Sequence, residues 1–465
     1  MQNILGRLPA SSFASAACVS RSWNSLCSSL LSSPRLSSAV SFNPSLENAV
    51  NEVFEKVLSE PIRPHFALAS IGPSFSLQAA LQLIDKKLGS RIPVIVNVSE
   101  GVIGRDVKTD QFVEVQWEVT MEEEDLGAVS PVENVNRGII LTVGFLPGLK
   151  AHIIPLFLGD KGPGSLLLDE FVMDIRESAS AVSDSTSPAG IILFADRETD
   201  IKPVLQTIGI GEIKFHVMLS TGISPLGNMY KAVSVKSNEN STWLTASRET
   251  VREHLDGQAI LEDIYEEITA LCPKLGDRIQ YPAFYIGVTK RRRRSVGKEK
   301  ARWMQFHEFH EVLGGDEEYL FVNSIGIKTR DPFRFYISDS GAALSSCNRV
   351  LNMLKDLKVD FDSINNHASP SVAHCDKKRV FGGMIFSCCG RGDSFFGHPG
   401  IDSSPFLKNF PGVTFGGTYC AGEIGREKLS LYDQDIEEGG SVICSQHVYS
   451  AVYLVMSYCP PPLEQ

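Results

Sequence analysis

Residues 1–26 read MQNILGRLPASSFASAACVSRSWNSL and have the spacing of short amphipathic helices. Pro9 separates two of them, because proline breaks a helix. Apolar residues recur at helical steps on both sides of this proline, at Ile4, Leu5, Leu8, Phe13, Ala16, Val19, Trp23 and Leu26. A segment of about 40 residues buries too little apolar surface to fold well alone. We therefore expect a partner, or the rest of the chain, to complete the apolar face.

Residues 4–26 resemble an F-box, the helical module with which substrate receptors dock on the Skp adaptor of cullin-based ubiquitin ligases. The Ile-Leu, Leu-Pro and Val-Ser-Arg groups and the tryptophan lie at the spacing that this family uses. The resemblance implies an adaptor-binding set of Ile4, Leu5, Leu8, Pro9, Val19 and Trp23. An F-box usually begins with a further Leu-Pro and a turn of helix before the position of Met1. We expect adaptor binding to be weakened where that turn is missing.

Two other interpretations of this segment stay open. The first acidic residue is Glu47, and an acid-free, serine-rich segment that contains arginine is also typical of an organelle transit peptide. Alternatively, Val19 and Trp23 merely cap the domain that follows. The ordered apolar spacing favours the helical module, because a transit peptide is recognised by composition.

The rest of the chain is predicted to be α+β. We expect the helical F-box-like segment at 1–40, a linker and helix at 41–60, and two mixed α/β lobes of sheets flanked by helices at 61–250 and 251–460, with a Ser/Pro-rich connector at 30–45. Helical patterns lie at 48–61, 76–89, the first part of 165–190, and 258–271. Strand patterns lie at 65–72, 91–104, 111–120, 137–147, 151–158, 189–196, 214–222, 230–237, 319–327, 334–338, 379–392 and 452–458. No leucine-rich repeat recurs at a period of 20–29 residues.

The lobes resemble the FIST N-terminal and FIST C-terminal sensory domains. The resemblance is carried by GMIFSCCGRGDSFFG at 383–397, FPGVTFGGTYCAGEIG at 410–425 and, in the first lobe, VNVSEGVIG at 96–104. It implies a sensor that holds a small ligand or a protein substrate. In this family context we expect a pocket on two glycine-rich turns, formed by Gly390, Arg391, Gly392, Gly422, Glu423 and Gly425.

The chemistry of these turns suits an amino-acid-like ligand. Glycines permit a positive φ and would aim Arg391 inward. Arg391 can hold a carboxylate bidentately, and Glu423 can accept from an amine of the same molecule. The alternative is that Arg391 and Glu423 pair with each other and join two loops without any ligand.

Three other motifs invite a functional interpretation. HEFHE at 307–311 has its histidines one residue too close for a zinc-protease motif, so we expect a solvated helix and no metal. Cys388 and Cys389 end an apolar strand, where buried inert thiols are usual, and the alternative is a reactive thiol activated by the nearby cation of Arg391. A dense basic run, formed by Lys290, Arg291, Arg292, Arg293 and Arg294, is predicted to be a loop between strands. It is either simply solvated, a nuclear-import signal, or a patch that binds anions.

Composition limits the function further. A net charge of −11 disfavours a nucleic-acid-binding body, and no apolar run approaches the ~20 residues of a membrane span. The ten cysteines include no CxxC pair, which argues against a zinc ribbon. The P-loop, the dinucleotide fingerprint and the nucleophile elbow are all missing from the sequence.

We therefore predict a non-catalytic receptor of a ubiquitin ligase, without cofactor, in the nucleus and the cytoplasm. Its expected partners are the Skp adaptor, a cullin, a protein substrate of unknown identity and a small amino-acid-like ligand. Nucleic acid and membranes are not expected partners. The alternative is a free-standing small-molecule sensor or enzyme with a degenerate N-terminal segment, which would not co-purify with the adaptor and cullin.

Overall fold

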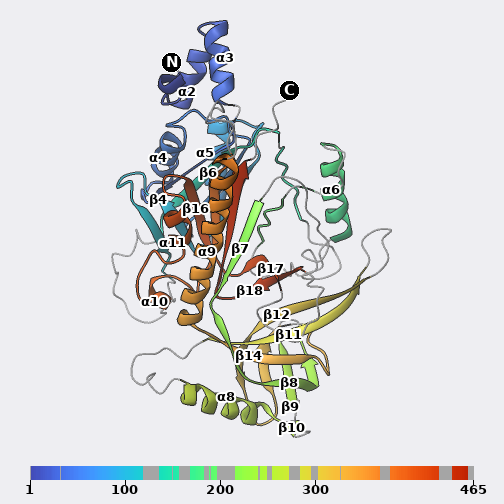
Figure 1. Cartoon of the computed structure of the whole chain (residues 1–465). Helices are drawn as coiled ribbons and strands as arrows, with labels where there is room; N and C mark the ends of the chain where they lie inside the picture. Colours follow the sequence, from blue (N-terminus) through green and yellow to red (C-terminus); the bar gives the residue numbers. More distant parts are fainter. Residues whose placement is uncertain are drawn as a thin grey trace. The chain divides into compact units, whose positions relative to one another are not determined.

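The computed structural model divides into two compact units (Figure 1). We call them the sandwich unit (Met1–Met218, Asn348–Ala421 and Ala451–Gln465) and the barrel unit (Leu219–Cys347 and Gly422–Ser450). The described residues are 2–31, 33–118, 136–148, 150–156, 168–182, 188, 190–195, 215–238, 241–248, 254–271, 283–294, 302–324, 326–366, 378–428 and 442–458. Their helices and sheets confirm the predicted α+β class.

The chain begins with three short helices, α1 (Gln2–Leu5), α2 (Ala10–Ala17) and α3 (Arg21–Leu30). Pro9 separates α1 from α2, as its sequence position predicts. Ser20 is the N-cap of α3, and its hydroxyl accepts from the backbone N–H of Trp23 at 3.2 Å. The helical step predicted from Val19 to Trp23 is wrong, because α2 ends at Ala17 and Val19 lies in the link to α3.

The first sheet of the sandwich unit has four strands, in the order β1 (Arg35–Ser41), β6 (Ile139–Phe145), β2 (Phe66–Ile71) and β3 (Val94–Val98). The helices α4 (Leu46–Val57) and α5 (Leu77–Leu88) pack on it through a core that includes Val50, Val53 and Ile84. The predicted connector is wrong over β1, where Ala39 and Val40 are fully buried. Pairing with β6 along all seven residues of β1 outweighs its serine content.

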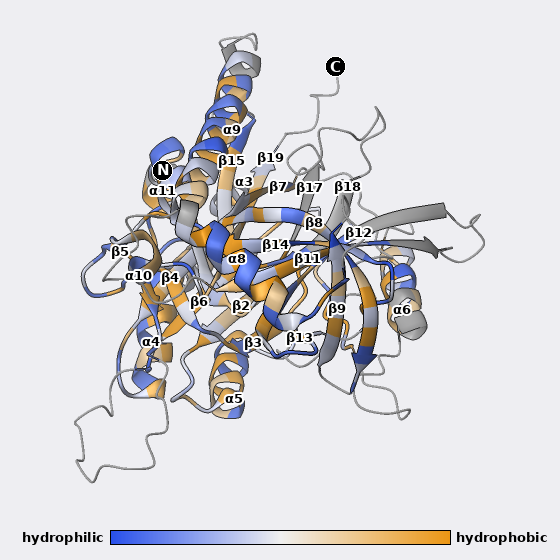
Figure 2. Ribbon diagram, turned by 90° about the horizontal axis from the view of Figure 1, so that it is seen from below, coloured by the Kyte–Doolittle hydropathy of each residue, from blue (hydrophilic) through white to orange (hydrophobic). Residues whose placement is uncertain are grey.

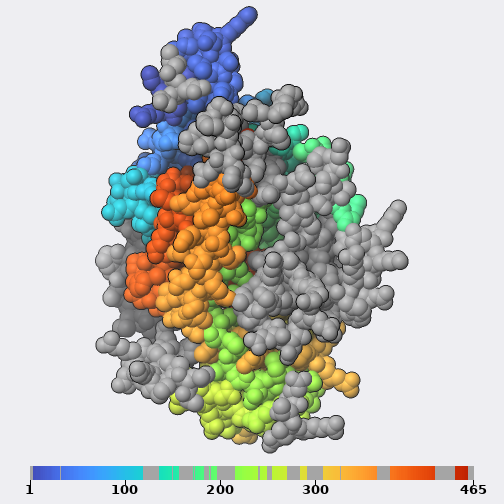
Figure 3. Space-filling view, viewed as in Figure 1, coloured from blue at the N-terminus to red at the C-terminus, as the bar shows by residue number. Residues whose placement is uncertain are grey.

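The second sheet has six strands. Their order is β5 (Phe112–Gln116), β4 (Gly101–Arg105), β16 (Thr414–Cys420), β15 (Arg379–Cys388), β19 (Ser450–Tyr458) and β7 (Phe215–Thr221). It packs on α9 (Ser340–Asn366) and α11 (Ser404–Asn409), which are orange and red-orange in Figure 3, through a core that includes Leu354, Phe361 and Phe406. The short helix α10 (Asp393–Phe396) precedes α11.

The two sheets of this unit face each other across apolar side chains, among them Leu36 and Met384. Glycines let them approach closely. A Cβ on Gly382 would lie 2.7 Å from the Cβ of Leu36, and one on Gly416 would lie 2.5 Å from Ser38 Oγ. Any side chain at these two positions would push the sheets apart.

The barrel unit contains a closed, antiparallel six-stranded barrel, in the order β9 (Thr242–Arg248), β13 (Leu320–Asn323), β12 (Arg302–Gly315), β11 (Phe284–Arg294), β14 (Pro332–Ser338) and β8 (Ile223–Ser237). Pairing of β8 with β9 closes it. The short β10 (His254–Leu255) pairs antiparallel with β9. The helix α8 (Gly257–Leu271), with orange and blue faces in Figure 2, packs against it through Ile260, Ile264 and Ile268. A separate two-stranded sheet joins β17 (Glu423–Lys428) to β18 (Val442–His447).

The sheets cross the lobe boundary predicted at residue 250. β8 and β9 come from the predicted first lobe but pair with β13 and β14 of the second. β4 of the first lobe likewise pairs with β16 of the second. Pairings between distant parts of the chain therefore decide the units, and no local composition signals them.

Several predicted elements differ from the structure. The expected strands at 151–158 and 189–196 are absent from the described residues 150–156 and 190–195, which lie beside α6 (Leu168–Ser180) in one small apolar cluster. α9 was not expected at all. Within the part of the chain that the structure describes, no helix is long and apolar enough to cross a membrane.

Candidate functional site

The three N-terminal helices form their own small core. Leu5, Phe13, Ala16 and Cys27 are buried in it, and Trp23 packs against it half-buried. Ser20 fixes the start of α3 and thereby the position of Trp23. Two of the predicted adaptor contacts, Leu5 and Trp23, therefore hold the segment together. Leu8 also packs partly against this core.

Other predicted contacts lie on the surface of the segment. Ile4 and Val19 are each 65% exposed, which is unusual for large aliphatic side chains in a folded segment. Pro9 is also exposed. Arg7 and Arg21 are the charged side chains of positions 1–33, so the segment is basic. An exposed apolar pair within a basic segment is suited to protein contact.

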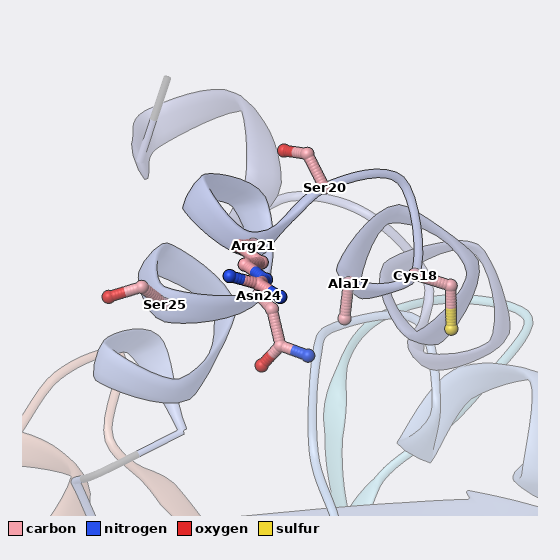
Figure 4. Close-up of a pocket in the computed structure, with 6 residues that line it drawn as sticks. All are labelled: Ala17, Cys18, Ser20, Arg21, Asn24 and Ser25. Carbon is pink, nitrogen blue, oxygen red and sulfur yellow. The ribbon is translucent and has the colours of Figure 1, made fainter.

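A shallow hollow of about 460 Å³ lies on the same segment (Figure 4). Its lining comes from the end of α2, the link and the start of α3, and consists of Ala17, Cys18, Ser20, Arg21, Asn24 and Ser25. The guanidinium of Arg21, the amide of Asn24 and the hydroxyls offer hydrogen-bond donors there. The hollow can therefore accept a polar or acidic side chain of a partner.

The predicted ligand residue Arg391 is fully buried in the sandwich unit. Its Nη2 lies 2.6 Å from Asp402 Oδ1 and its Nε 3.0 Å from Asp402 Oδ2, so Asp402 accepts two bonds from the guanidinium fork. Asp402 Oδ2 also accepts from Ser387 Oγ at 2.7 Å, and the Phe396 ring centre lies 5.1 Å from the guanidinium carbon. The bidentate carboxylate partner in the structure thus belongs to the protein.

The turn around Arg391 is fixed from β5. Gly392 has a φ of +118°, a backbone conformation that favours glycine, and a Cβ there would also crowd the side-chain amide of Gln116. Gln116 donates to the carbonyl oxygens of Cys389 and Arg391. The positive φ expected for Gly390 as well is not found.

A second carboxylate, Glu114, completes this buried polar network. Its oxygens accept from the backbone N–H groups of Ser403 at 2.7 Å and Gly400 at 3.1 Å. Burial raises the pKa of the Glu114 carboxyl, the hydrogen bonds of Ser403 oppose the rise, and the charge of Asp402 adds to it. Tyr419, whose hydroxyl lies 3.5 Å from Glu114, has its pKa raised mainly by burial.

The second glycine-rich turn belongs to the barrel unit. Glu423 is buried and accepts from Ser450 Oγ at 2.8 Å. Gly425 is paired with Ser445 in the β17–β18 ladder, and a Cβ on Gly422 would lie 2.9 Å from Gln446 Nε2. The structure therefore assigns the two turns to different units, and ligand binding by these six residues stays a prediction.

The two polar motifs of the barrel unit are strands. HEFHE lies on β12 and the basic run on β11, so the predicted helix and the predicted loop are both wrong. The two strands pair with each other, which gives each polar run a ladder of backbone hydrogen bonds. Among the described residues, no group of three or more His, Cys, Asp or Glu side chains is placed to hold a metal ion.

A buried ion pair lies at the start of the basic run. Lys290 Nζ lies 2.7 Å from Glu308 Oε2, with both side chains less than a tenth exposed, and His310 Nε2 lies 3.5 Å from the same oxygen. On the opposite face of β12, His307 is 3.1 Å from Thr289 Oγ1. Burial lowers the pKa of His307 to about 4, so its ring is neutral at pH 7.

Sequence reasoning missed the three carboxylates that organise these networks, Asp402, Glu114 and Glu308. A signal for one of them was present. Asp402 is the sole acidic residue between Asp393 and Glu423, in a glycine-rich apolar stretch just after Arg391. A lone acid in such surroundings is a candidate for a buried pair.

Comparison with known proteins agrees with the N-terminal geometry. Residues 1–33 match the F-box domain, and they contain α1, α2 and α3 completely. The F-box/LRR-repeat protein At5g63520 of Arabidopsis thaliana is 38% identical to the chain over 516 aligned residues, which cover 98% of this chain and 92% of that protein. In the present chain, the described strands form the two sheets of the sandwich unit, the sheet that closes into the barrel, and the two-stranded β17–β18 sheet.

Proposed function

Because this chain belongs to the F-box protein family represented by that Arabidopsis relative, we propose that it is the substrate-recognition subunit of a Skp-cullin-F-box ubiquitin ligase. The N-terminal helices would dock on the Skp adaptor, which is bound to the cullin. The sandwich and barrel units would hold the protein substrate. The subunit itself would perform no chemistry in the transfer of ubiquitin.

One observation carries the proposal. The residues that match the F-box form a helical cluster with Ile4 and Val19 exposed. Exposure of aliphatic side chains to water is unfavourable. Covering them with a partner stabilises the complex by about 1.5–3 kcal/mol for each side chain that becomes fully buried. The half-buried Trp23 and the buried Leu5 would act by holding this surface in shape.

The test replaces the exposed residues and leaves the core intact. In the full chain, Ile4→Ser with Val19→Ser should weaken binding to the purified adaptor by at least about tenfold, since each change removes apolar contact. The matched control is Leu313→Ser with Val359→Ser, because these two aliphatic residues are each 56% exposed elsewhere in the chain. The control should bind within about twofold of the parent.

Affinity measured by surface plasmon resonance distinguishes the outcomes. A parent chain that does not bind the adaptor, or an Ile4/Val19 variant that binds as well as the parent, would refute the proposal. Trp23→Ala is a less specific test, since the indole also packs on the helical core.

The finer parts of the proposal concern ligand and location. The FIST resemblance supports a small amino-acid-like ligand, which a thermal-shift screen with free amino acids would reveal as a raised melting temperature. The basic run supports a nuclear as well as a cytoplasmic population, although Arg291 to Arg294 belong to a paired strand. Serine in place of these four arginines should lower the nuclear fraction of a tagged chain, and an unchanged fraction would refute the import signal.

The alternative of a free-standing sensor makes the opposite prediction. Such a protein would give a thermal shift with a metabolite and would not co-purify with the adaptor. The F-box match over the whole helical cluster favours the ligase subunit.

A further inference from the structure

The strands β11 and β12 continue together past the rest of the barrel. Pairing of β11 with β14 ends at Val288, and pairing of β12 with β13 begins only at Glu311. Beyond these residues, 289–294 and 302–310 are hydrogen-bonded only with each other among the described strands, and Figure 1 shows the two yellow strands running on together. The strand β18 lies against β12 nearer the barrel, where the ring centres of Phe309 and His447 are 6.5 Å apart. We call 291–294 with 302–305 the ribbon tip. A two-stranded ribbon is marginally stable by itself in water.

The ribbon tip concentrates positive charge. Its cross-strand pairs are Arg291 with Gln305, Arg292 with Met304, Arg293 with Trp303, and Arg294 with Arg302. It contains five arginines and no carboxylate. Like charges directly opposite each other destabilise a ladder, and successive arginines repel along the strand. A local cost of this kind is expected where a sequence serves a binding function.

A buried ion pair lies just before the ribbon tip. Lys290, the residue before it, is neutralised by Glu308 at 2.7 Å, and both are buried. The carboxylate that pairs with the first cation of the run therefore lies outside the tip. The sequence of the tip itself, at 291–294 and 302–305, supplies no acid to the arginines that follow.

We propose that the ribbon tip docks a short, carboxylate-rich segment of a protein substrate, an inference that rests on the proposed function. The arginine fork matches a carboxylate bidentately, and clusters of arginines recognise acidic peptides. Four strand residues span about 13 Å, the length of a short extended peptide. A long nucleic acid would reach past the tip towards a chain whose net charge is −11, which repels a polyanion.

The experiment measures fluorescence anisotropy of a labelled oligoglutamate peptide with the purified full chain at about 0.1 M salt. Two variants remove two positive charges each from the ribbon tip, Arg291→Gln with Arg293→Gln and Arg292→Gln with Arg294→Gln. The matched control removes two from the exposed end of α5, Lys86→Gln with Lys87→Gln. At least one arginine variant should weaken the peptide's affinity about tenfold, while the lysine control stays within about twofold of the parent.

Each other outcome overturns the proposal. Equal losses in all three variants would mean that total charge, and not the ribbon tip, attracts the peptide. A single-stranded RNA with the same number of negative charges that binds more tightly than oligoglutamate would make the tip a nucleic-acid site. The absence of peptide binding by the parent would refute the docking surface outright. Adaptor affinity is measured on the same preparations. A parent chain that binds the adaptor but not the peptide would refute only the docking surface, whereas a chain that does not bind the adaptor would refute the proposed function.

Circular dichroism and thermal melting of the variants provide the folding control. Glutamine keeps the backbone ladder and removes repulsion, so the variants should melt no lower than the parent. A lost peptide affinity in a variant with unchanged melting then reports on docking alone.

Discussion

The sandwich and barrel units each contain a buried ion pair, but the two pairs are built differently. Arg391 and Asp402 have no exposed side-chain surface and share two charge-assisted bonds, with Ser387 donating to the same carboxylate. Lys290 and Glu308 remain slightly exposed and share one bond of 2.7 Å. A guanidinium fork fixes direction, whereas an ammonium acts as a compact charge. The first pair therefore fixes a chain turn, and the second neutralises one end of a basic strand.

The fixed turn has a clear structural purpose. The loop 389–403 connects β15 to α11, and it contains both members of the pair. Tyr453 of β19 donates to the carbonyl of Asp402 at 2.7 Å, and Glu114 of β5 binds the backbone at 400 and 403. Strands from both halves of the chain thus converge on this loop.

The largest expected effect breaks the sandwich pair. Arg391→Ala should lower the free energy of unfolding of the sandwich unit by about 3–5 kcal/mol, because Asp402 would be left as a buried, unpaired charge. Urea denaturation followed by far-UV circular dichroism measures it. Arg391→Met combined with Asp402→Leu should recover most of the loss. An Arg391→Ala variant as stable as the parent would show that the ion pair does not hold the turn.

Breaking the barrel pair should have a smaller effect. Lys290→Met should cost about 2 kcal/mol, in the range of one hydrogen bond between charged groups, since the methionine still fills the space of the aliphatic stem. The measurement is urea denaturation beside Arg391→Ala in one series. If Lys290→Met destabilised the protein more than Arg391→Ala, the stronger of the two ion pairs would be the one in the barrel unit, contrary to this prediction.

The stability of the barrel unit and that of the sandwich unit should depend on pH in opposite directions. The pKa of His307 is lowered to about 4 by burial, so its contribution is present above the ordinary histidine value near 6.5 and is lost as pH falls towards 4. The pKa of Glu114 is raised mainly by burial, so its contribution is present below the ordinary carboxyl value and is lost as pH rises through the folded value.

Thermal unfolding between about pH 4 and pH 8 tests this opposition. His307→Gln should flatten the acid side of the profile, and Glu114→Gln should flatten the loss on the alkaline side. Superimposable profiles for the parent and both variants would contradict the two assignments.

The smallest expected effect concerns the ribbon tip. Arg302→Glu places an opposite charge across from Arg294 and should stabilise the ribbon by about 0.5 kcal/mol. Slower amide hydrogen exchange along β11 and β12 would record the gain. Arg302→Gln, which only removes the repulsion, should give about half of it. Faster exchange in the glutamate variant would show that the like-charge pair carries no cost.

Local signals predicted the N-terminal segment well. The helix-breaking Pro9 and the apolar steps lie within a few residues of one another, so the local pattern was enough to predict short helices on either side of the proline. Most strands with apolar runs, such as β2, β6 and β19, also lie where the sequence places them. Burial on both faces makes such strands continuous apolar runs.

Elements without a clear local pattern were missed. The arginine run lacks the alternation of apolar and polar residues that marks a strand, yet pairing with β12 makes it one. The 27-residue helix α9 buries a regular stripe of Ala343, Cys347, Val350, Leu354 and Phe361, but the exposed aliphatic residues on its other side obscure that pattern. The partner of Lys290 had no such signal, because Glu308 lies 18 residues away within a polar run, whereas the lone Asp402 was an available signal for the partner of Arg391.

The place of β19 in its sheet has a consequence for synthesis on the ribosome. β19 lies between β15 and β7, and it is the last described strand to be translated. β7 is therefore synthesised long before its sheet partner β19, because the whole barrel unit and β15 are translated between them. The F-box helices are made first, long before this sheet can close. A chain that stops before β19 would carry complete F-box helices together with an open sheet edge, which is a surface prone to aggregation.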